Sequence, residues 1–248
     1  MSIWKILEIE YENTWNSKVI GVIFLVLSAS YIYSLKGSAT ILWTHTSLIY
    51  LSEFVRGYLA SSIVLVIFVS YVFSKSVSKQ ISSGLIKTWL GFPIKRNHLL
   101  LAKFIFGYLL LISSEILPLL YSGYLYGFNI GLFIVLITML LKILFYSSYT
   151  MFFSLIIRDP LVSFAGSLLS LYAIELAPSF LYNLGLEDIA NIININNVVF
   201  GLYRVLNTKW WIKEFLEIKL WVTPLIYIGI SIFLILLSLQ IFKKMDLD

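Results

Sequence analysis

The sequence predicts an all-α integral membrane protein that forms a single transmembrane domain over residues 1–248. Of its residues, 60% are hydrophobic and only 12% are charged, whereas soluble domains carry about 25% charged residues. Apolar runs of bilayer-crossing length recur along the chain, which favours membrane spans over a very hydrophobic soluble core. These runs are too long for barrel strands, and backbone groups find no water in lipid, so we expect helices.

Six apolar segments are long enough to cross a membrane, since a span needs about 20 residues. They are Val19–Leu35, Gly57–Phe73, Leu99–Tyr121, Ile130–Ile157, Leu161–Leu181 and Thr223–Phe242. The first two are short, and the fourth is long enough to tilt or to emerge from the bilayer. The sequence therefore predicts six transmembrane helices.

Basic residues indicate which side of the membrane each loop occupies. An even number of spans places both termini on one side, and basic residues concentrate in cytosolic loops. Cytosolic termini put eleven basic residues inside and six outside, with Lys142 left in the membrane. The eleven are Lys5, Lys18, Lys75, Lys79, Lys87, Lys95, Arg96, Lys103, Arg158, Lys243 and Lys244. We therefore expect a multi-pass protein of the plasma membrane with both termini in the cytosol.

The cytosolic loop at residues 74–98 is the most informative stretch. Five of the eighteen basic residues lie between Lys75 and Arg96 without an acidic residue among them. The apolar residues of the loop recur at spacings of four, four and three, which puts them on one face of a helix. They are Ile81, Leu85, Trp89 and Phe92. Pro93 ends this helix because it cannot continue the hydrogen-bond ladder. From the residues alone, such a helix either binds a partner or lies on the anionic inner leaflet.

Two local patterns resemble a known family. The run LGFPIKR at residues 90–96 follows a polar helix containing Ser83-Gly84-Leu85, and Lys103 lies at the start of the third span. Residues 242–247 are an aromatic residue, two basic residues, Met245 and then Asp-Leu. With six spans, a basic loop after the second and a long loop before the last, this layout resembles the permease subunits of type 2 ATP-binding-cassette exporters. Pro93, Arg96 and Lys103 match the family's pattern.

The resemblance implies a mechanism. Such permeases work in pairs around a central path, and a cytosolic coupling helix of each permease sits in a cleft of a separate ATPase subunit. Here the coupling helix would be Val77–Phe92, with Ile81, Leu85 and Trp89 as its packing residues. The external segment at residues 182–222 would form a helical or re-entrant gate. Residues 1–18 would form an amphipathic connecting helix.

The sequence lacks the residues that several functional classes require. The chain has no Gly-x-x-x-x-Gly-Lys-[Ser/Thr] phosphate loop, so we expect ATP and Mg²⁺ to bind a separate P-loop ATPase and this chain to be no enzyme on its own. It has no cysteine, and His45 and His98 fall on opposite sides of the membrane, so we expect no metal site. The net charge of +5 is typical of a membrane protein with one basic side and does not indicate nucleic-acid binding.

Three charged residues lie within apolar spans: Glu115, Lys142 and Glu175. Intramembrane charges usually face one another or water. In one interpretation these three residues line a substrate path. In the other, Lys142 and Glu175 form an internal ion pair and Glu115 reaches water at the outer face. These charges also leave an alternative function open, an ion-coupled secondary transporter or channel. A membrane enzyme or a non-transporting helper protein is a third class.

Overall fold

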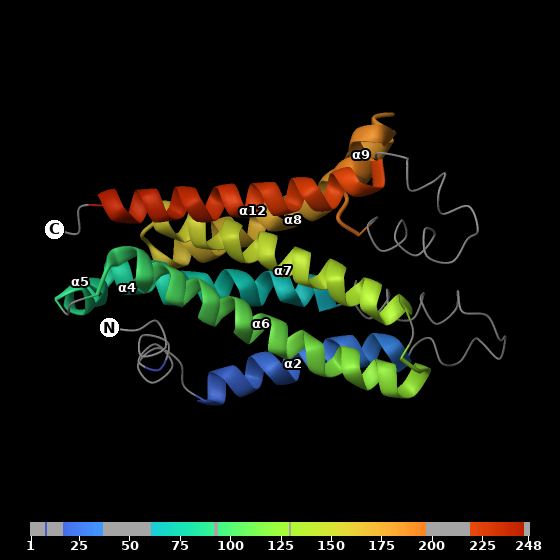
Figure 1. Cartoon of the computed structure of the whole chain (residues 1–248), viewed down its shortest axis with the longest axis horizontal. Coiled ribbons are helices and arrows are strands. Elements are labelled where there is room, and N and C mark those ends of the chain that lie inside the picture. The colour runs from blue at the N-terminus through green and yellow to red at the C-terminus, as the bar shows by residue number, and fades with distance from the viewer. Residues whose placement is uncertain are drawn as a thin grey trace.

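The structure is a computed structural model that describes residue 8 and residues 17–36, 61–91, 94–128, 130–196 and 219–245. All regular elements within these residues are helices. Figure 1 shows the long helices lying side by side and running in alternate directions. The predicted connecting helix at 1–18 lies outside the described residues, apart from Glu8 and the last two positions.

The long helices are α2 (Ser17–Lys36), α6 (Arg96–Tyr126), α7 (Ile130–Ile156), α8 (Pro160–Asn183) and α12 (Lys219–Lys244). A further long helix covers Ser61–Ser82 and includes the π-helix η1 (Ser74–Ser78) and α4 (Lys79–Ser82). The short helices are α5 (Leu85–Leu90) and α9 (Glu187–Ile193).

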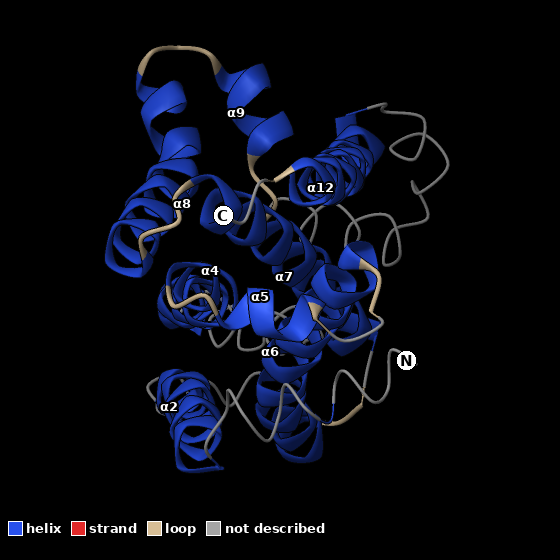
Figure 2. Ribbon diagram, turned by 90° about the vertical axis from the view of Figure 1, so that its left-hand side faces the viewer, coloured by secondary structure: helices blue, strands red, loops and turns tan. Residues whose placement is uncertain are grey.

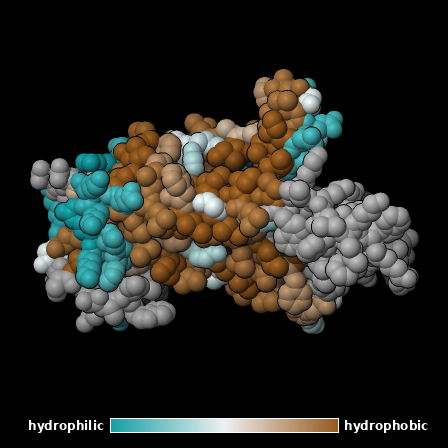
Figure 3. All heavy atoms as spheres, turned by 45° about the horizontal axis from the view of Figure 1, so that its top comes forward, coloured by the Kyte–Doolittle hydropathy of each residue, from teal (hydrophilic) through white to brown (hydrophobic). Residues whose placement is uncertain are grey.

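Five of these helices are long and apolar enough to cross a membrane. They are Ser61–Ser82, Arg96–Leu125, Leu132–Ile156, Pro160–Asn183 and Val222–Lys244. A shorter apolar stretch, Lys18–Tyr33, lies in α2. Figure 3 shows a broad hydrophobic surface over the middle of the bundle. The described part of the chain is therefore all-helical, and its apolar helices are those of a multi-pass membrane protein.

The predicted spans from the third to the sixth agree with α6, α7, α8 and α12 to within a few residues. The second span was expected to end at Phe73, and this boundary is wrong because the helix continues to Ser82. Residues 74–78 remain helical because Val77 and three small serines of this turn are buried. A buried serine hydroxyl costs little where a carbonyl oxygen accepts its hydrogen bond, as Ser154 does for Ser78 at 3.0 Å.

Helix α7 lies at the centre of the bundle, in contact with α6, α8, α12 and η1. Its second half carries small hydroxyl residues that are buried, and such residues let neighbouring helices approach closely. They are Ser147, Ser148, Thr150 and Ser154. By contrast, α8 and α12 bury only a small part of their length. Their apolar outer faces are therefore available to lipid or to another protein.

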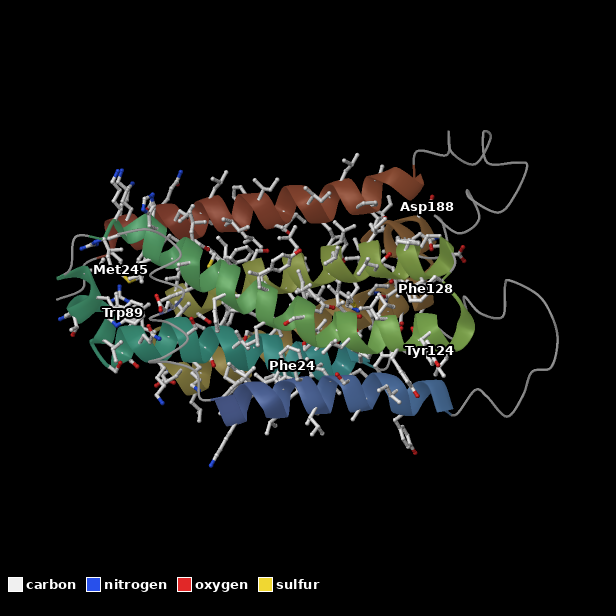
Figure 4. The ribbon with its side chains drawn as sticks, turned by 60° about the horizontal axis from the view of Figure 1, so that its bottom comes forward. Phe24, Trp89, Tyr124, Phe128, Asp188 and Met245 are labelled. Atoms are coloured by element: carbon white, nitrogen blue, oxygen red, sulfur yellow. The ribbon has the colours of Figure 1, made fainter. Side chains whose placement is uncertain are left out.

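The two ends of the bundle differ in charge. The start of α6, α5 and the end of α12 lie at one end (Figure 1), which we call the basic end. Exposed or half-buried basic residues there are Lys79, Lys87, Lys95, Arg96, Arg158, Lys243 and Lys244. Figure 4 shows Trp89 and Met245 at this end and Asp188 at the opposite end.

Candidate functional site

The basic loop does not form the single helix that was predicted over 77–92. Helix α4 ends at Ser82 and α5 begins at Leu85, and Ser83 and Gly84 turn the chain between them. Gly84 has φ +72°, a left-handed conformation that glycine adopts at no steric cost. Serine also favours turns because its hydroxyl competes for backbone hydrogen bonds. We call residues 79–91 the elbow.

The break changes which side chains point into the protein. Trp89 is 7% exposed and Ile86 1%, whereas Leu85 is 39% exposed. Ile81, in the other arm of the elbow, is half-buried. The predicted common face of Ile81, Leu85 and Trp89 is therefore wrong, because Ile86 and Trp89 are buried while Leu85 is exposed. Phe92 and Pro93 lie outside the described residues.

Lys103 connects the elbow to the bundle. It is 1% exposed, and its Nζ atom lies 2.5 Å from Oε1 of Gln80. The same atom lies 4.8 Å from the centre of the Trp89 ring. A buried ammonium needs such partners, because burying a charge without them is costly. Lys103 thus joins α6 to both arms of the elbow.

Arg96 makes a second connection at the basic end. Its Nη1 donates to the carbonyl oxygen of Met245 at 2.7 Å and to that of Lys243 at 3.4 Å. The last carbonyl groups of a helix lack partners within the helix, and a guanidinium near that end satisfies them. Arg96 therefore fastens the start of α6 to the end of α12.

The π-helix fastens the elbow to the turn between α7 and α8. The buried Ser78 hydroxyl donates to the carbonyl oxygens of Ser154 and Ile157. In that turn, Asp159 accepts from the amides of Leu161 and Val162 at 2.9 and 2.8 Å and so caps α8. Short π-helical segments inside α-helices often occur at functional sites.

Two of the charged residues within the apolar helices, Lys142 and Glu175, form a buried network in the half of the bundle away from the basic end. Lys142 of α7 is fully buried and forms an ion pair with Glu175 of α8, whose side chain is 20% exposed. The Lys142 ammonium also donates to the Ser62 hydroxyl at 2.5 Å. The Tyr146 hydroxyl donates to Glu175. The network thus links three helices.

Helix α9 folds back from the end of α8 and brings a fourth segment to this network. Asn196 accepts from the Lys142 ammonium at 3.4 Å. Side chains of α12 hold the same segment, since the Tyr227 hydroxyl donates to Ile193 O at 2.6 Å and the Thr223 hydroxyl to Ile192 O at 2.8 Å. Within the predicted 182–222 segment, residues 187–193 thus form helix α9, and residues 194–196 bring the chain back to the bundle. Residues 197–218 lie outside the described residues.

Glu115 does not reach outer-face water, so that expectation is wrong. Its side chain is fully buried, and among the described residues neither carboxylate oxygen has a hydrogen-bond partner. The cavity beside Glu175 has a volume of about 10 Å³ and is lined by Tyr146, Tyr227 and residues 193–195, among others. That space holds about one water molecule, so the described conformation offers no cargo-sized path here.

Sequence reasoning identified the charged members of these contacts but missed their neutral partners. Gln80, Ser62, Tyr146 and Asn196 are ordinary polar residues that lie far along the chain from the groups they contact. Tyr146 follows Lys142 by four residues, a spacing that places both on one face of a helix. No spacing links the other three to the groups that they contact, so only the packing of the helices reveals those three. Within the described residues, no group of three potential metal ligands occurs.

Neither a family model nor a curated protein sequence matches this chain.

Proposed function

We propose that this chain is the permease subunit of a type 2 ATP-binding-cassette exporter. Two permeases, either two copies of this chain or this chain with a homologous one, would form the translocation path. A separate P-loop ATPase would bind ATP and Mg²⁺. The local patterns at 80–103 and 242–247 support the proposal. One observation carries it: an elbow of two short helices, held against the bundle, lies between two apolar helices at the basic end.

The charge distribution supports an orientation for this function. The basic end carries seven exposed or half-buried basic side chains named above, and basic residues concentrate on the cytosolic side of a membrane. In our proposal this end faces the cytosol of a cell whose plasma membrane holds the protein. The elbow would then be in the compartment where ATP is available.

The elbow offers an outward and an inward surface for coupling. Leu85 and Lys87 are exposed and would contact the ATPase. Trp89 is buried and contacts the Lys103 ammonium, so a displacement of α5 would move α6. Ser78, which directly precedes α4 in the other arm, would carry the displacement to the turn between α7 and α8.

The test is purification of the full-length tagged chain from its native membranes with all stable partners. We expect a P-loop ATPase among these partners and ATP hydrolysis by the purified complex. Leu85→Glu should reduce recovery of the ATPase about tenfold, because a buried interface contact is worth more than 1 kcal/mol. Lys244→Glu, an exposed change at the same end but on α12, is the control. A complete inventory of partners without a P-loop ATPase would contradict the proposal.

The buried network favours a second candidate, an ion-coupled transporter or channel. Lys142, Glu175 and Glu115 are charged residues inside apolar helices, and intramembrane charges often mark ion pathways. This candidate expects transport by the chain alone in vesicles, driven by an ion gradient without ATP. Glu175→Gln should abolish that transport. Vesicles that transport only with an ATPase and ATP would exclude this candidate.

A further inference from the structure

An apolar groove runs between α2, the Ser61–Ser82 helix and α8 near the basic end. Its volume is about 360 Å³. Its lining residues are Lys18, Val19, Val22, Ile23, Ile67, Phe68, Tyr71 and Phe164. Val22 is 56% exposed and Ile67 39%, so the groove opens onto the outer surface of the bundle.

The groove exists because α2 leaves the bundle towards the basic end. Helix α2 packs against α6, and the Ser28 hydroxyl lies 3.5 Å from Ser114 O. Figure 1 shows that α2 and α6 converge away from the basic end and diverge towards it. Figure 2 shows α2 set apart from the helix that ends in α4. The first two turns of α2 thus form one wall of the groove.

The groove lies at the depth of lipid headgroups and of the first part of their acyl chains. Lys18 is the second residue of α2, and Ile23 lies about 8 Å further along the helix. Phe164 lies about 6 Å along α8 from Pro160. Along the Ser61–Ser82 helix, Tyr71 lies about 6 Å and Ile67 about 12 Å further from the basic end than Lys75. The groove therefore extends about 12 Å below Lys75, within one leaflet of a hydrocarbon core that is about 30 Å thick. Tyr71 fits this depth, since tyrosine is frequent at membrane interfaces.

Two ammonium groups lie at the headgroup end of the groove. Lys18 is exposed at its mouth. Lys75 lies one turn beyond Tyr71, with its Nζ atom 5.7 Å from the centre of the Tyr71 ring. Asp159, an acidic residue at the same end, accepts two amides of α8. The groove is thus cationic at the membrane surface and apolar below it.

This combination selects a ligand by its headgroup. An acyl chain gains little by moving from the bilayer into the groove, because lipid is as apolar as the side chains that line it. Basic pockets between transmembrane helices bind anionic headgroups, and each lysine near the surface adds to the attraction. We propose that the groove binds one anionic phospholipid of the adjacent leaflet, with an acyl chain between α2 and α8 and its phosphate between Lys18 and Lys75. The lipid bridges α2 to the rest of the bundle.

The first experiment fills the groove. The delipidated full-length protein is mixed with equal amounts of phosphatidylglycerol and phosphatidylethanolamine that have the same acyl chains, and retained lipid is counted by native mass spectrometry. We expect one retained phosphatidylglycerol. Val22→Trp should remove it, because the indole occupies the groove. Leu25→Trp is the matched control, since Leu25 lies on the same helix, is 69% exposed and does not line the groove.

The second experiment removes a charge without changing the apolar lining. Lys18→Gln should lower the preference for phosphatidylglycerol about fivefold, whereas Lys95→Gln, an exposed lysine outside the groove, should not. Equal retention of both lipids by the unchanged protein, or equal effects of the two tryptophan variants, would overturn the proposal. A change in oligomeric state in Val22→Trp with unchanged lipid retention would make the groove an interface between copies and would also overturn it.

Discussion

At the scale of single residues, Lys142 determines how four segments meet. Its ammonium contacts Glu175, Ser62 and Asn196, which come from three different parts of the chain. A charge without partners is costly inside a membrane. Separating these segments would leave the ammonium without its partners, so the ammonium holds them together. The same group therefore stabilises the bundle and holds the returning segment that follows α9.

The first prediction concerns this ion pair. Lys142→Met should lower the free energy of unfolding by about 3 kcal/mol, because it leaves a largely buried carboxylate without its partner. Glu175→Gln should act similarly on the buried ammonium. The double variant should regain at least about 1 kcal/mol over the worse single, since no uncompensated charge remains. Denaturant unfolding in detergent measures all three, with the exposed change Glu187→Gln as the control. A double variant no more stable than either single would disprove the coupling.

The second prediction concerns the amide that accepts from Lys103. Gln80→Leu removes this acceptor while keeping the side-chain volume, so the protein should lose about 2 kcal/mol of stability. Lys79→Leu, an exposed change at the neighbouring position, should change stability by less than about 0.5 kcal/mol. The midpoint of thermal unfolding distinguishes the two variants. Equal midpoints would mean that Gln80 does not support the buried ammonium.

At the scale of elements, the elbow depends on one backbone conformation. Gly84 has φ +72°, and a Cβ atom built there meets nothing within 4 Å. The cost of a side chain at this position is therefore conformational and not steric. A turn with this backbone separates α4 from α5, so Gln80 of one arm and Trp89 of the other can both reach the Lys103 ammonium.

The third prediction tests this conformation. Gly84→Ala should destabilise the protein by about 1 kcal/mol, because the left-handed conformation is unfavourable for alanine. Gly229→Ala in α12 is the matched control, since its Cβ also meets nothing within 4 Å while its backbone is helical. The control should be neutral or up to about 1 kcal/mol more stable. Equal effects in denaturant unfolding would show that the turn does not require glycine.

The sequence predicted long apolar elements well and their interruptions poorly. The helices α6, α7, α8 and α12 follow from uninterrupted hydrophobicity, which needs no knowledge of neighbours. The continuation of the second span past Phe73 depends on η1 being buried against α7 and α8, which no local pattern contains. The break at Gly84 was missed because the spacing of apolar residues continues through it.

At the scale of the whole molecule, charge separates the two ends. Figure 3 shows hydrophilic side chains gathered at the basic end and a hydrophobic middle. The opposite end carries Glu187 and Asp188 in α9. Because membrane insertion responds to basic residues and little to acidic ones, the basic end determines the orientation.

The fourth prediction tests that orientation. The chain has no cysteine, so a single introduced cysteine can be labelled without background. With a maleimide that does not cross membranes, Glu187→Cys should react in intact cells. Lys95→Cys should react only after the cells are permeabilised. The reverse pattern would place the elbow outside the cell and would remove the basis for an ATP-driven partner.

The π-helix at Ser74–Ser78 has a consequence for charge. This turn contains one residue more than a turn of α-helix. The side chains after it are therefore rotated about the helix axis by about 100° relative to their directions in an uninterrupted α-helix. A regular α-helix through the same residues would present Lys79, in place of Gln80, to the Lys103 ammonium. Two like charges would then meet in a buried space. Electrostatic repulsion thus penalises the more regular helix and preserves the irregular turn.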